Sequence, residues 1–288
     1  MSESTVTELS SEVLRKSKGI KVGNGDALLV FYQGTLMNGE QFDANYDFST
    51  FEVVEGRVAF DFTLGAGQVI EGWDLGLAGQ KLGSVVDLTI PADQAYGEAS
   101  VGNIPPNSPL KFTVEVVAVL PAGSEEPVFT DYKDLGIKTK KIGLTDELIN
   151  STSGVKIGLD SADVLVGEKA NDLLIGLKGK DILEGGRGAD VLIGGKGKDT
   201  YLYENIKDSR AAKGKSDHLL DFGKKDKIDL SAIADELRFI GSDSFSGAAG
   251  DVRFDNEVLE LDKNGNGKAD LSLVLPGTES IKSSNLIL

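Results

Sequence analysis

The sequence predicts a multidomain protein in which an α+β domain precedes an all-β region with a parallel β-roll and a β-rich C-terminal cap. Residues 19–120 carry short β-type runs separated by turns, and they include one short helical pattern. This combination is typical of an antiparallel sheet wrapped on a short helix. Residues 158–202 instead repeat with a period of nine, which is typical of a coiled, solenoid-like β structure.

The first region contains one helix pattern and four strand patterns. In residues 71–80, EGWDLGLAGQ, the apolar residues Trp73 and Leu77 fall about one helical turn apart. Strands are indicated where β-branched or aromatic residues recur at every second position. The expected strands are 27–36, 58–65, 85–90 and 110–120.

Composition and pattern divide the chain into five segments. The stretch PAGSEEP at 121–127 has the composition of a linker, and the tail after the repeats is rich in β-type runs. We therefore expect an N-terminal extension at 1–18, an α+β domain at 19–121, a linker at 122–157, repeats at 158–202 and a C-terminal β domain at 203–288.

Composition also excludes several classes of function. The chain has 30 basic and 46 acidic residues, and this excess of acid argues against nucleic acid and anionic membrane surfaces as partners. No apolar run approaches the ~20 residues of a membrane span, and the N-terminus lacks the apolar core of a signal peptide. With no cysteine and only His218 as histidine, thiol chemistry and an HExxH zinc site are excluded.

The repeats divide into five units of nine residues. They read GLDSADVLV, GEKANDLLI, GLKGKDILE, GGRGADVLI and GGKGKDTYL, with Gly first and Asp sixth in every unit. Glycine permits a tight turn, and the last three residues of a unit form a short strand. Two units make one coil, and the eighth residues are expected to point inward as a core. These residues are Leu165, Leu174, Leu183, Leu192 and Tyr201.

The sixth-position aspartates predict calcium binding. Stacked turns bring these carboxylates into ladders, where like charges repel one another. Ca²⁺ takes oxygen ligands from carboxylates and turn carbonyls and removes this repulsion. The later units are expected to bind best, because Ser161 and Glu168 replace glycines in the first two. The candidate metal residues are Asp163, Asp172, Asp181, Asp190 and Asp199, with Gly179, Gly188 and Gly197 in the turns and Asp217 after the last unit.

A second acidic loop, DKNGNG at 262–267, imitates the start of an EF-hand. Its twelfth position is Leu273, where a calcium loop needs a bidentate Glu. A hydrophilic β-turn is therefore the favoured interpretation of this loop, with an EF-hand as the alternative.

The nine-residue pattern resembles the calcium-binding repeats of the RTX family. Residues 216–233, residues 245–271 and the terminal NLIL resemble the C-terminal domain of serralysin-type proteases. This resemblance implies about three calcium sites in five units, a cap on the β-roll, and an uncleaved C-terminal signal for type I secretion. The sequence contains no zinc motif of the protease itself.

Residues 19–120 resemble the FKBP family of peptidyl-prolyl isomerases. The elements YxG, FDxx, GxxVIxGWxxGL, AYG and IPPxxxLxFxVE occur in order. The resemblance places the substrate proline on Trp73, makes Tyr96 a hydroxyl donor and Asp43 a carboxylate at the pocket edge, and puts Ile104 against the substrate chain. It also assigns the apolar walls to Tyr32, Phe42, Phe60, Val69, Ile70 and Phe112.

The sequence departs from the family at the pocket rim. About eight residues are inserted between Asp43 and Phe62, and the loop 98–103 is shorter than usual. These departures concern substrate preference and rate more than fold.

The resulting prediction is a peptidyl-prolyl cis-trans isomerase, exported through the type I secretion machinery of a bacterium and folded by external Ca²⁺. Its substrates would be proline-containing polypeptides, and no catalytic cofactor is expected. The alternative is a secreted calcium-binding protein whose FKBP-like domain holds proline-containing segments with little or no catalysis. The presence of both Trp73 and Tyr96 favours the enzyme.

Overall fold

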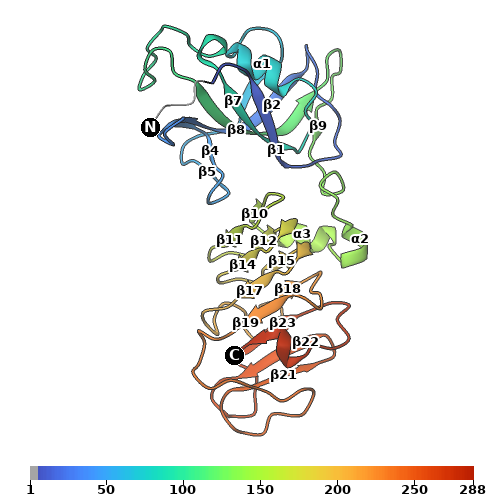
Figure 1. The fold of residues 1–288 in the computed structure, drawn as a ribbon. Coiled ribbons are helices and arrows are strands. Elements are labelled where there is room, and N and C mark those ends of the chain that lie inside the picture. Colours follow the sequence, from blue (N-terminus) through green and yellow to red (C-terminus); the bar gives the residue numbers. More distant parts are fainter. Residues whose placement is uncertain (1–5) are drawn as a thin grey trace. The chain divides into compact units, whose positions relative to one another are not determined.

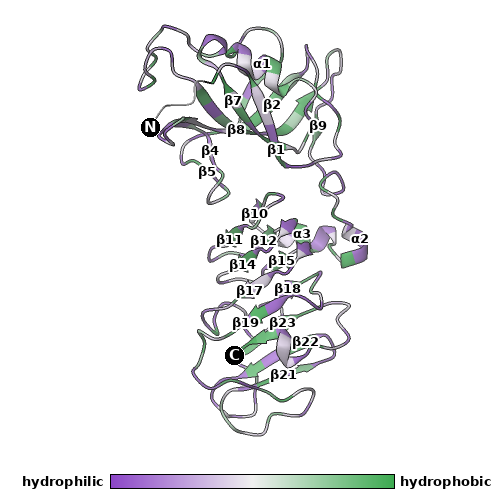
Figure 2. Ribbon diagram, in the orientation of Figure 1, coloured by the Kyte–Doolittle hydropathy of each residue, from purple (hydrophilic) through white to green (hydrophobic). Residues whose placement is uncertain are grey.

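The computed structural model describes residues 6–288 and divides into two compact units between Ile137 and Lys138 (Figure 1). Both units are predominantly β, and hydrophobic residues concentrate in their strands (Figure 2). No helix in the described part of the chain is long and apolar enough to cross a membrane.

The first unit is built on an antiparallel sheet in the order β1-β7-β8-β2-β3, with β6 added to β2 and β9 to β8. Three strands have the bounds that the sequence predicted, and the strand expected at 58–65 is shorter. The strands are β1 (Ser10–Arg15), β2 (Ala27–Leu36), β3 (Gln41–Ala44), β6 (Phe60–Thr63), β7 (Val85–Ile90), β8 (Leu110–Leu120) and β9 (Val128–Phe129).

Helix α1 (Glu71–Leu77) packs closely on β7 because two glycines face the sheet. A Cβ at Gly72 would overlap the side chain of Ile90, and one at Gly76 would lie 2.9 Å from Cδ2 of Leu88. Only residues without a side chain allow this approach. The predicted helix therefore exists, although it ends three residues earlier than expected.

Strand β1 was not predicted, and it lies in the segment expected to be an extension. It pairs antiparallel with β7, and its Arg15 is 1% exposed. The Arg15 guanidinium forms an ion pair with Glu115 on β8 and donates from Nε to the Gly83 carbonyl at 3.1 Å. A strand with mostly exposed side chains is thus anchored by one buried charge pair.

The chain between Asp43 and Phe62 forms a small hairpin of β4 (Tyr46–Asp47) and β5 (Glu52–Val53). Tyr46 stacks on Phe31 of β2 with ring centroids 4.8 Å apart. The residues inserted relative to the family pattern therefore form an ordered element beside the sheet.

In the second unit, strands of the repeats pair in parallel with partners 18 residues apart. Leu165 lies opposite Leu183, and Leu174 lies opposite Leu192. Alternate units contribute to two different sheets, so two units make one coil. All five eighth-position residues are 0% exposed, which confirms the predicted inward column.

Both sheets extend beyond the repeats on the C-terminal side, and the one that contains β10 also begins before them. One has the order β11-β14-β17-β19-β24 and the other β10-β12-β15-β18-β23-β22-β21-β20, with a small pair β13-β16. The bounds are β10 (Gly154–Ile157), β11 (Val164–Val166), β12 (Asp172–Ile175), β13 (Lys178–Gly179), β14 (Ile182–Glu184), β15 (Val191–Ile193), β16 (Lys196–Gly197), β17 (Thr200–Leu202), β18 (Asp217–Leu219), β19 (Lys227–Asp229), β20 (Arg238–Phe239), β21 (Asp251–Asp255), β22 (Val258–Asp262), β23 (Leu271–Val274) and β24 (Leu286–Ile287).

The segment expected as a linker, 122–157, contains ordered elements. Besides β9 it holds α2 (Thr139–Ile142) and α3 (Asp146–Ser151), and its β10 pairs in parallel with β12. The parallel sheet therefore begins before the first nine-residue unit.

Candidate active site and calcium-binding turns

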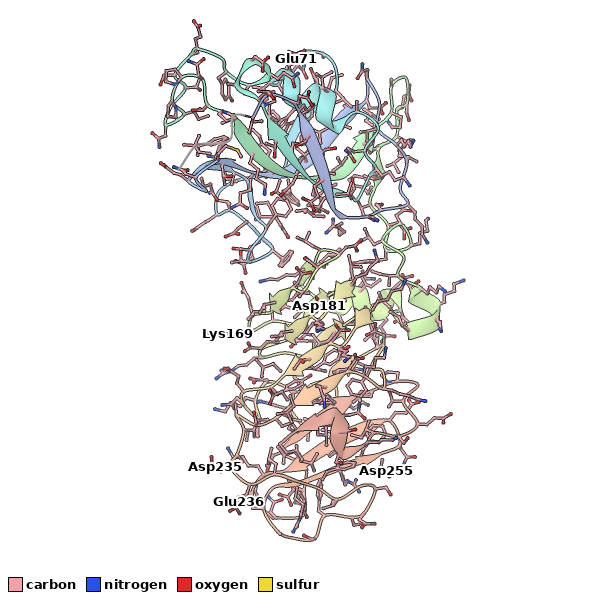
Figure 3. The ribbon with its side chains drawn as sticks, viewed as in Figure 1. Glu71, Lys169, Asp181, Asp235, Glu236 and Asp255 are labelled. Carbon is pink, nitrogen blue, oxygen red and sulfur yellow. The ribbon has the colours of Figure 1, made fainter. Side chains whose placement is uncertain are left out.

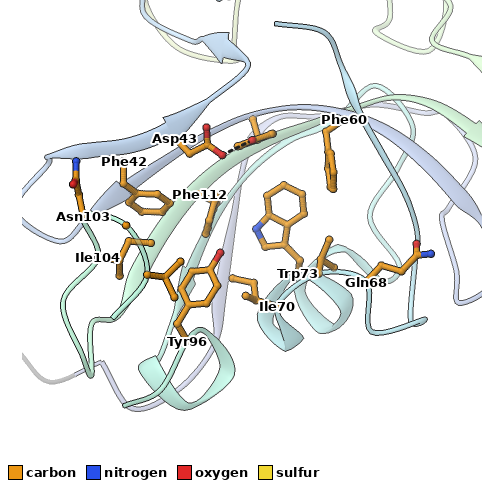
Figure 4. Close-up of a pocket in the computed structure, with 14 residues that line it drawn as sticks. Phe42, Asp43, Phe60, Gln68, Ile70, Trp73, Tyr96, Asn103, Ile104 and Phe112 are labelled. Carbon is orange, nitrogen blue, oxygen red and sulfur yellow. Dashed lines mark hydrogen bonds between the residues drawn. The ribbon is translucent and has the colours of Figure 1, made fainter. Parts of the chain in front are cut away.

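The first unit has a cavity of about 420 Å³ above α1 (Figure 4). All ten residues that the family resemblance singled out line it, so the structure brings every one of them together. They are Tyr32, Phe42, Asp43, Phe60, Val69, Ile70, Trp73, Tyr96, Ile104 and Phe112.

Trp73 is the floor of this cavity. It is 4% exposed, and other rings meet its indole edge to face, with centroids at 5.1 Å for Phe112 and 5.4 Å for Tyr32. Its Nε1 is buried and has no hydrogen-bond partner among residues 6–288. The helix turns Trp73 toward the cavity, while its glycines Gly72 and Gly76 face the sheet.

A second glycine position lets two wall rings close together. Gly34 lies on β2, and a Cβ there would come within 2.7 Å of Phe42 and of Phe112. These two rings pack edge to face with centroids 5.4 Å apart. The glycine of the YxG element is therefore needed so that these two rings can pack together beside the pocket.

The polar edge of the pocket is a chain of three side chains. Tyr32 Oη donates to Asp43 Oδ2 at 2.6 Å, and Arg57 lies 3.2 Å from Asp43 Oδ1. Burial, and next the hydrogen bond to Asp43, raises the pKa of Tyr32 well above its ordinary value. The Tyr32 hydroxyl is therefore already engaged by the protein.

Tyr96 is the donor that remains available. Its side chain is 37% exposed at the pocket, and its hydroxyl has no hydrogen-bond partner within the described residues. Figure 4 shows the hydroxyl directed into the pocket. Burial is the main cause that raises the pKa of Tyr96, so the phenol is protonated at neutral pH and can donate.

Sequence reasoning missed several rim residues and one support. Gln68, Val101, Gly102 and Asn103 also line the cavity, and each is a neighbour in the chain of a predicted site residue or lies in the short loop. Asn45, which is 3% exposed, accepts the Tyr32 backbone N–H at 2.7 Å and donates to the carbonyls of Val30 and Val58. Nothing in an isolated Asn at this position signals such a role.

In the second unit, the aspartates of the repeats form two buried ladders. From Asp181 onward, Oδ1 of each ladder aspartate accepts the backbone N–H of the aspartate one coil earlier, at distances between 2.9 and 3.1 Å. Asp181, which Figure 3 labels among the strands of the repeats, is 1% exposed. The donor and acceptor pairs are Asp163 and Asp181, Asp172 and Asp190, Asp181 and Asp199, Asp190 and Asp217, and Asp199 and Asp226.

Several of these carboxylates have an unsatisfied oxygen. Oδ2 of Asp181, Asp190, Asp199 and Asp217 is buried without a hydrogen-bond partner among the described residues. Burial, with neighbouring carboxylates adding to it, raises the pKa of Asp181 and of Asp190 to about 7. Asp217 is fully buried, and burial followed by the Asp190 carboxylate raises its pKa strongly.

The turn backbone surrounds these carboxylates with further oxygens. A Cβ at Gly188 would lie 2.5 Å from both the Ala170 carbonyl oxygen and Asp190 Oδ1. At Gly179 and Gly197 a Cβ would likewise overlap a carbonyl oxygen of an adjacent coil. Oxygen-only donors with unpaired charge suit a hard cation such as Ca²⁺. Among residues 6–288, no three His, Asp or Glu side chains lie together so that they could hold a metal ion by themselves, so such a cation would rely on carbonyl oxygens as well.

The ladders extend past the predicted repeats. Aspartates continue at nine-residue intervals through Asp208, Asp217 and Asp226, and this spacing was the signal that could have identified Asp226. Asp221 was also missed, since it breaks the spacing. It accepts the backbone N–H groups of Gly194 and Gly195 and lies 3.2 Å from the Tyr201 hydroxyl.

The acidic loop at 262–267 forms a turn, in agreement with the favoured interpretation of the sequence. Asp262 Oδ1 accepts the N–H of Gly265 at 2.8 Å, and its Oδ2 accepts that of Gly267 at 2.7 Å. Both oxygens of this carboxylate are thus used within the loop.

Comparison with known proteins agrees with both halves of this picture. A family model for FKBP-type peptidyl-prolyl cis-trans isomerases matches residues 18–117, and one for the peptidase M10 serralysin C terminal matches residues 138–288. The chain therefore belongs to the FKBP-type peptidyl-prolyl cis-trans isomerase family, and its C-terminal part belongs to the serralysin C-terminal family.

Individual relatives match the first unit. FK506-binding protein 2 of Dictyostelium discoideum is 41% identical over 101 residues, which are 35% of this chain and 70% of that protein. FK506-binding protein 1A of Neurospora crassa is 42% identical over 113 residues, which are 38% of this chain and 88% of that protein. A crystal structure of FkpA from Escherichia coli matches with 39% identity and a TM-score of 0.34, over 40% of this chain and 49% of that one.

Proposed function

We propose that the first unit isomerises Xaa-Pro bonds in secreted or surface polypeptides, and that the second unit binds calcium and serves type I export. The observation that carries the enzymatic part is the cavity itself. It is floored by Trp73, walled by aromatic and aliphatic side chains, and supplied with one unpartnered hydroxyl, that of Tyr96.

The cavity suits the rotation of a prolyl bond. Rotation breaks amide resonance over a barrier of ~18–20 kcal/mol, and no covalent bond to the protein has to form. The twisted amide has less charge separation between N and O than the planar one. A dry aromatic pocket therefore stabilises the twisted state more than the planar state, and this difference in binding lowers the barrier.

Two side chains orient the substrate. A proline ring that rests on the indole of Trp73 would be held by packing among the surrounding rings. Tyr96 would donate its hydroxyl proton in a hydrogen bond to a substrate carbonyl, without transferring it. Tyr32 cannot do this while its hydroxyl donates to Asp43.

The calcium proposal is supported by the buried aspartates. Bound Ca²⁺ would neutralise the carboxylates of Asp181, Asp190 and Asp199, which are buried and whose Oδ2 atoms have no hydrogen-bond partner among the described residues. Because their sites exist only when the coils are stacked, metal binding is coupled to folding. A chain that stays unfolded at low internal Ca²⁺ and folds outside the cell fits type I export, and its net charge of −16 favours solubility before folding.

Turnover of a short Xaa-Pro peptide tests the enzymatic proposal. NMR exchange between the cis and trans peptide is measured with the full chain in Ca²⁺ and in chelator, and circular dichroism is recorded on the same samples. We expect turnover in both conditions and added β structure only in Ca²⁺. The relatives are named for binding FK506, so FK506 is expected to compete with the peptide.

A matched control separates the pocket from the rest of the unit. Phe129 is 63% exposed on β9 and does not line the cavity, so Phe129→Ala should leave turnover unchanged. Absence of turnover in both conditions, with the first unit folded, would leave a binding module and contradict the proposed catalysis.

A further inference from the structure

Two short strands share one edge of β2 and leave a gap between them. On that edge β6 pairs with residues 27–30 and β3 pairs with residues 33–35, whereas β8 runs along the whole opposite edge. Phe31 and Tyr32 therefore stand between the two ladders. The chain that connects β3 to β6 contains the insertion, so the gap lies where the insertion leaves the sheet and where it returns.

Asn45 fills this gap with all of its hydrogen-bonding groups. Its side-chain Oδ1 accepts the Tyr32 N–H at 2.7 Å, and its backbone N–H donates to the Tyr32 carbonyl at 3.0 Å. Its Nδ2 donates to the carbonyls of Val30 at 3.1 Å and Val58 at 3.0 Å, and its own carbonyl accepts the Val54 N–H at 3.0 Å. Because Asn45 is buried, loss of its side chain would leave these backbone groups without a partner.

Both legs of the insertion carry wall residues of the cavity. The leg that leaves the sheet begins directly after β3, which supplies Phe42 and Asp43. The leg that returns is held at Val58, two residues before Phe60, and Phe60 lines the cavity as well. The five hydrogen bonds of Asn45, which we call the Asn45 clamp, therefore tie two walls of the pocket together across the insertion.

The clamp also holds the part of β2 that carries a pocket ring. Tyr32 is bonded by the clamp at both of its backbone groups. Its ring meets Phe60 edge to face with centroids 6.2 Å apart, and it meets Trp73 in the same way at 5.4 Å (Figure 4). A shift of the returning leg would change these contacts without removing any ring. Small displacements in a site that must fit one geometry reduce catalysis strongly.

We propose that Asn45 is a positioning residue of the isomerase, which holds the inserted segment as a fixed wall and so sets Phe60 against the floor at Trp73. Asn45 is not among the residues that line the cavity, so it acts through the wall and not by touching the substrate. This inference rests on the proposed isomerase activity. It makes the insertion part of the site, although the insertion lies outside the family pattern.

Turnover and stability are measured together on the full chain in Ca²⁺. Asn45→Ala removes the side-chain bonds of the clamp, and Asn45→Asp keeps an oxygen for the Tyr32 N–H but loses both amide donors. Arg15→Ala is the matched control, because it breaks a buried polar contact of the same unit on β1, at the edge of the sheet opposite β3. Arg15 is not among the residues that line the cavity.

Three readouts separate positioning from stability. NMR exchange of an Xaa-Pro peptide gives kcat/KM, and urea denaturation gives the unfolding midpoint of the first unit. The native fluorescence spectrum reports on the pocket alone, since Trp73 is the single tryptophan of the chain. Where a variant does not fold, trimethylamine N-oxide is added to all samples, because this osmolyte favours the folded state.

We expect kcat/KM to fall about 10- to 100-fold in both Asn45 variants, because the wall is displaced. The native fluorescence of Trp73 should change with it. The Arg15 control should have a lower urea midpoint. It should keep the wild-type spectrum and a kcat/KM within about twofold, because it is remote from the pocket.

Two results would overturn the proposal. One is a folded Asn45 variant with wild-type turnover, and the other is an equal loss of turnover in Arg15→Ala, which would mean that the loss follows stability alone. A wild-type chain without turnover contradicts the proposed isomerase activity itself, so the two failures are distinguishable.

Discussion

The isomerase unit buries aromatic and aliphatic side chains around one helix, whereas the repeat unit buries a thin column of leucines beside rows of carboxylates. In the first unit the ring-lined core and the pocket are continuous, so stability and function depend on the same packing. In the second unit, Oδ2 of Asp181, Asp190, Asp199 and Asp217 is buried without a hydrogen-bond partner among the described residues. The comparison teaches that apolar packing holds the first unit, whereas the second unit buries carboxylates that the proposed Ca²⁺ would neutralise.

Removal of calcium should produce the largest difference in stability between the two units. In chelator, we expect residues 158–226 to lose nearly all protection against amide hydrogen exchange, because repulsion among buried carboxylates is no longer offset. Residues 27–120 should keep theirs, since their core is apolar. Exchange followed by mass spectrometry measures both in one sample, and equal loss in the two units would show that the first unit depends on the second.

The next largest effect is expected from Trp73→Ala. Removing a large buried ring costs about 3–5 kcal/mol of unfolding free energy, and it also removes the floor on which the proline would rest. We expect kcat/KM for an Xaa-Pro peptide to fall at least about 100-fold. Urea denaturation of the first unit measures the loss of unfolding free energy, and peptide exchange by NMR measures the fall in kcat/KM. A fall in stability with undiminished turnover would contradict the role of the indole as the pocket floor.

The buried ion pair of β1 ranks third. Arg15→Ala leaves the mostly buried Glu115 unpaired, since the side-chain exposures of Arg15 and Glu115 are 2% and 13% in the native pair. The substitution should lower the unfolding free energy by about 3 kcal/mol. Arg57→Ala is the matched control, because its pair with Asp43 is 56% and 41% exposed and such pairs contribute about 1 kcal/mol or less. Urea midpoints of the two variants give the comparison, and equal midpoints would refute the anchoring role of Arg15.

The same contrast explains what the sequence could predict. Residues 27–36, 85–90 and 110–120 show a period-two apolar pattern, which is local information, and they form strands with those bounds. Strand β1, SSEVLR, lacks such a pattern and depends on Glu115, a partner 100 residues away. Sequence patterns therefore reveal elements held by their own hydrophobic face, but not those held by one distant contact.

The functional residues divide in the same way. The ten pocket residues follow from motifs with fixed spacing, and the structure gathers all ten in one cavity. Oδ2 accepts a backbone N–H of its own turn at Asp163 and Asp172 but has no partner at Asp181 and Asp190. This difference has no counterpart in the sequence, because it depends on the backbone conformation of the residue after the first glycine. Leu177 in particular would not be expected to have a positive φ, since a side chain disfavours it.

The smallest predicted effect concerns a single hydroxyl and compares two tyrosines of the same pocket. Tyr96→Phe removes a donor with no partner in the described protein, so the unfolding free energy should change by less than about 0.5 kcal/mol. If Tyr96 donates to the substrate carbonyl in the transition state, kcat/KM should fall about tenfold, which corresponds to about 1.4 kcal/mol.

Tyr32→Phe is the counterpart of Tyr96→Phe, because the Tyr32 hydroxyl already donates a hydrogen bond to Asp43 at 2.6 Å. That variant should lose about 1 kcal/mol of stability and little turnover. The opposite order, with turnover more sensitive at Tyr32, would mean that the chain from Tyr32 through Asp43 to Arg57 orients the substrate and that Tyr96 only lines the wall.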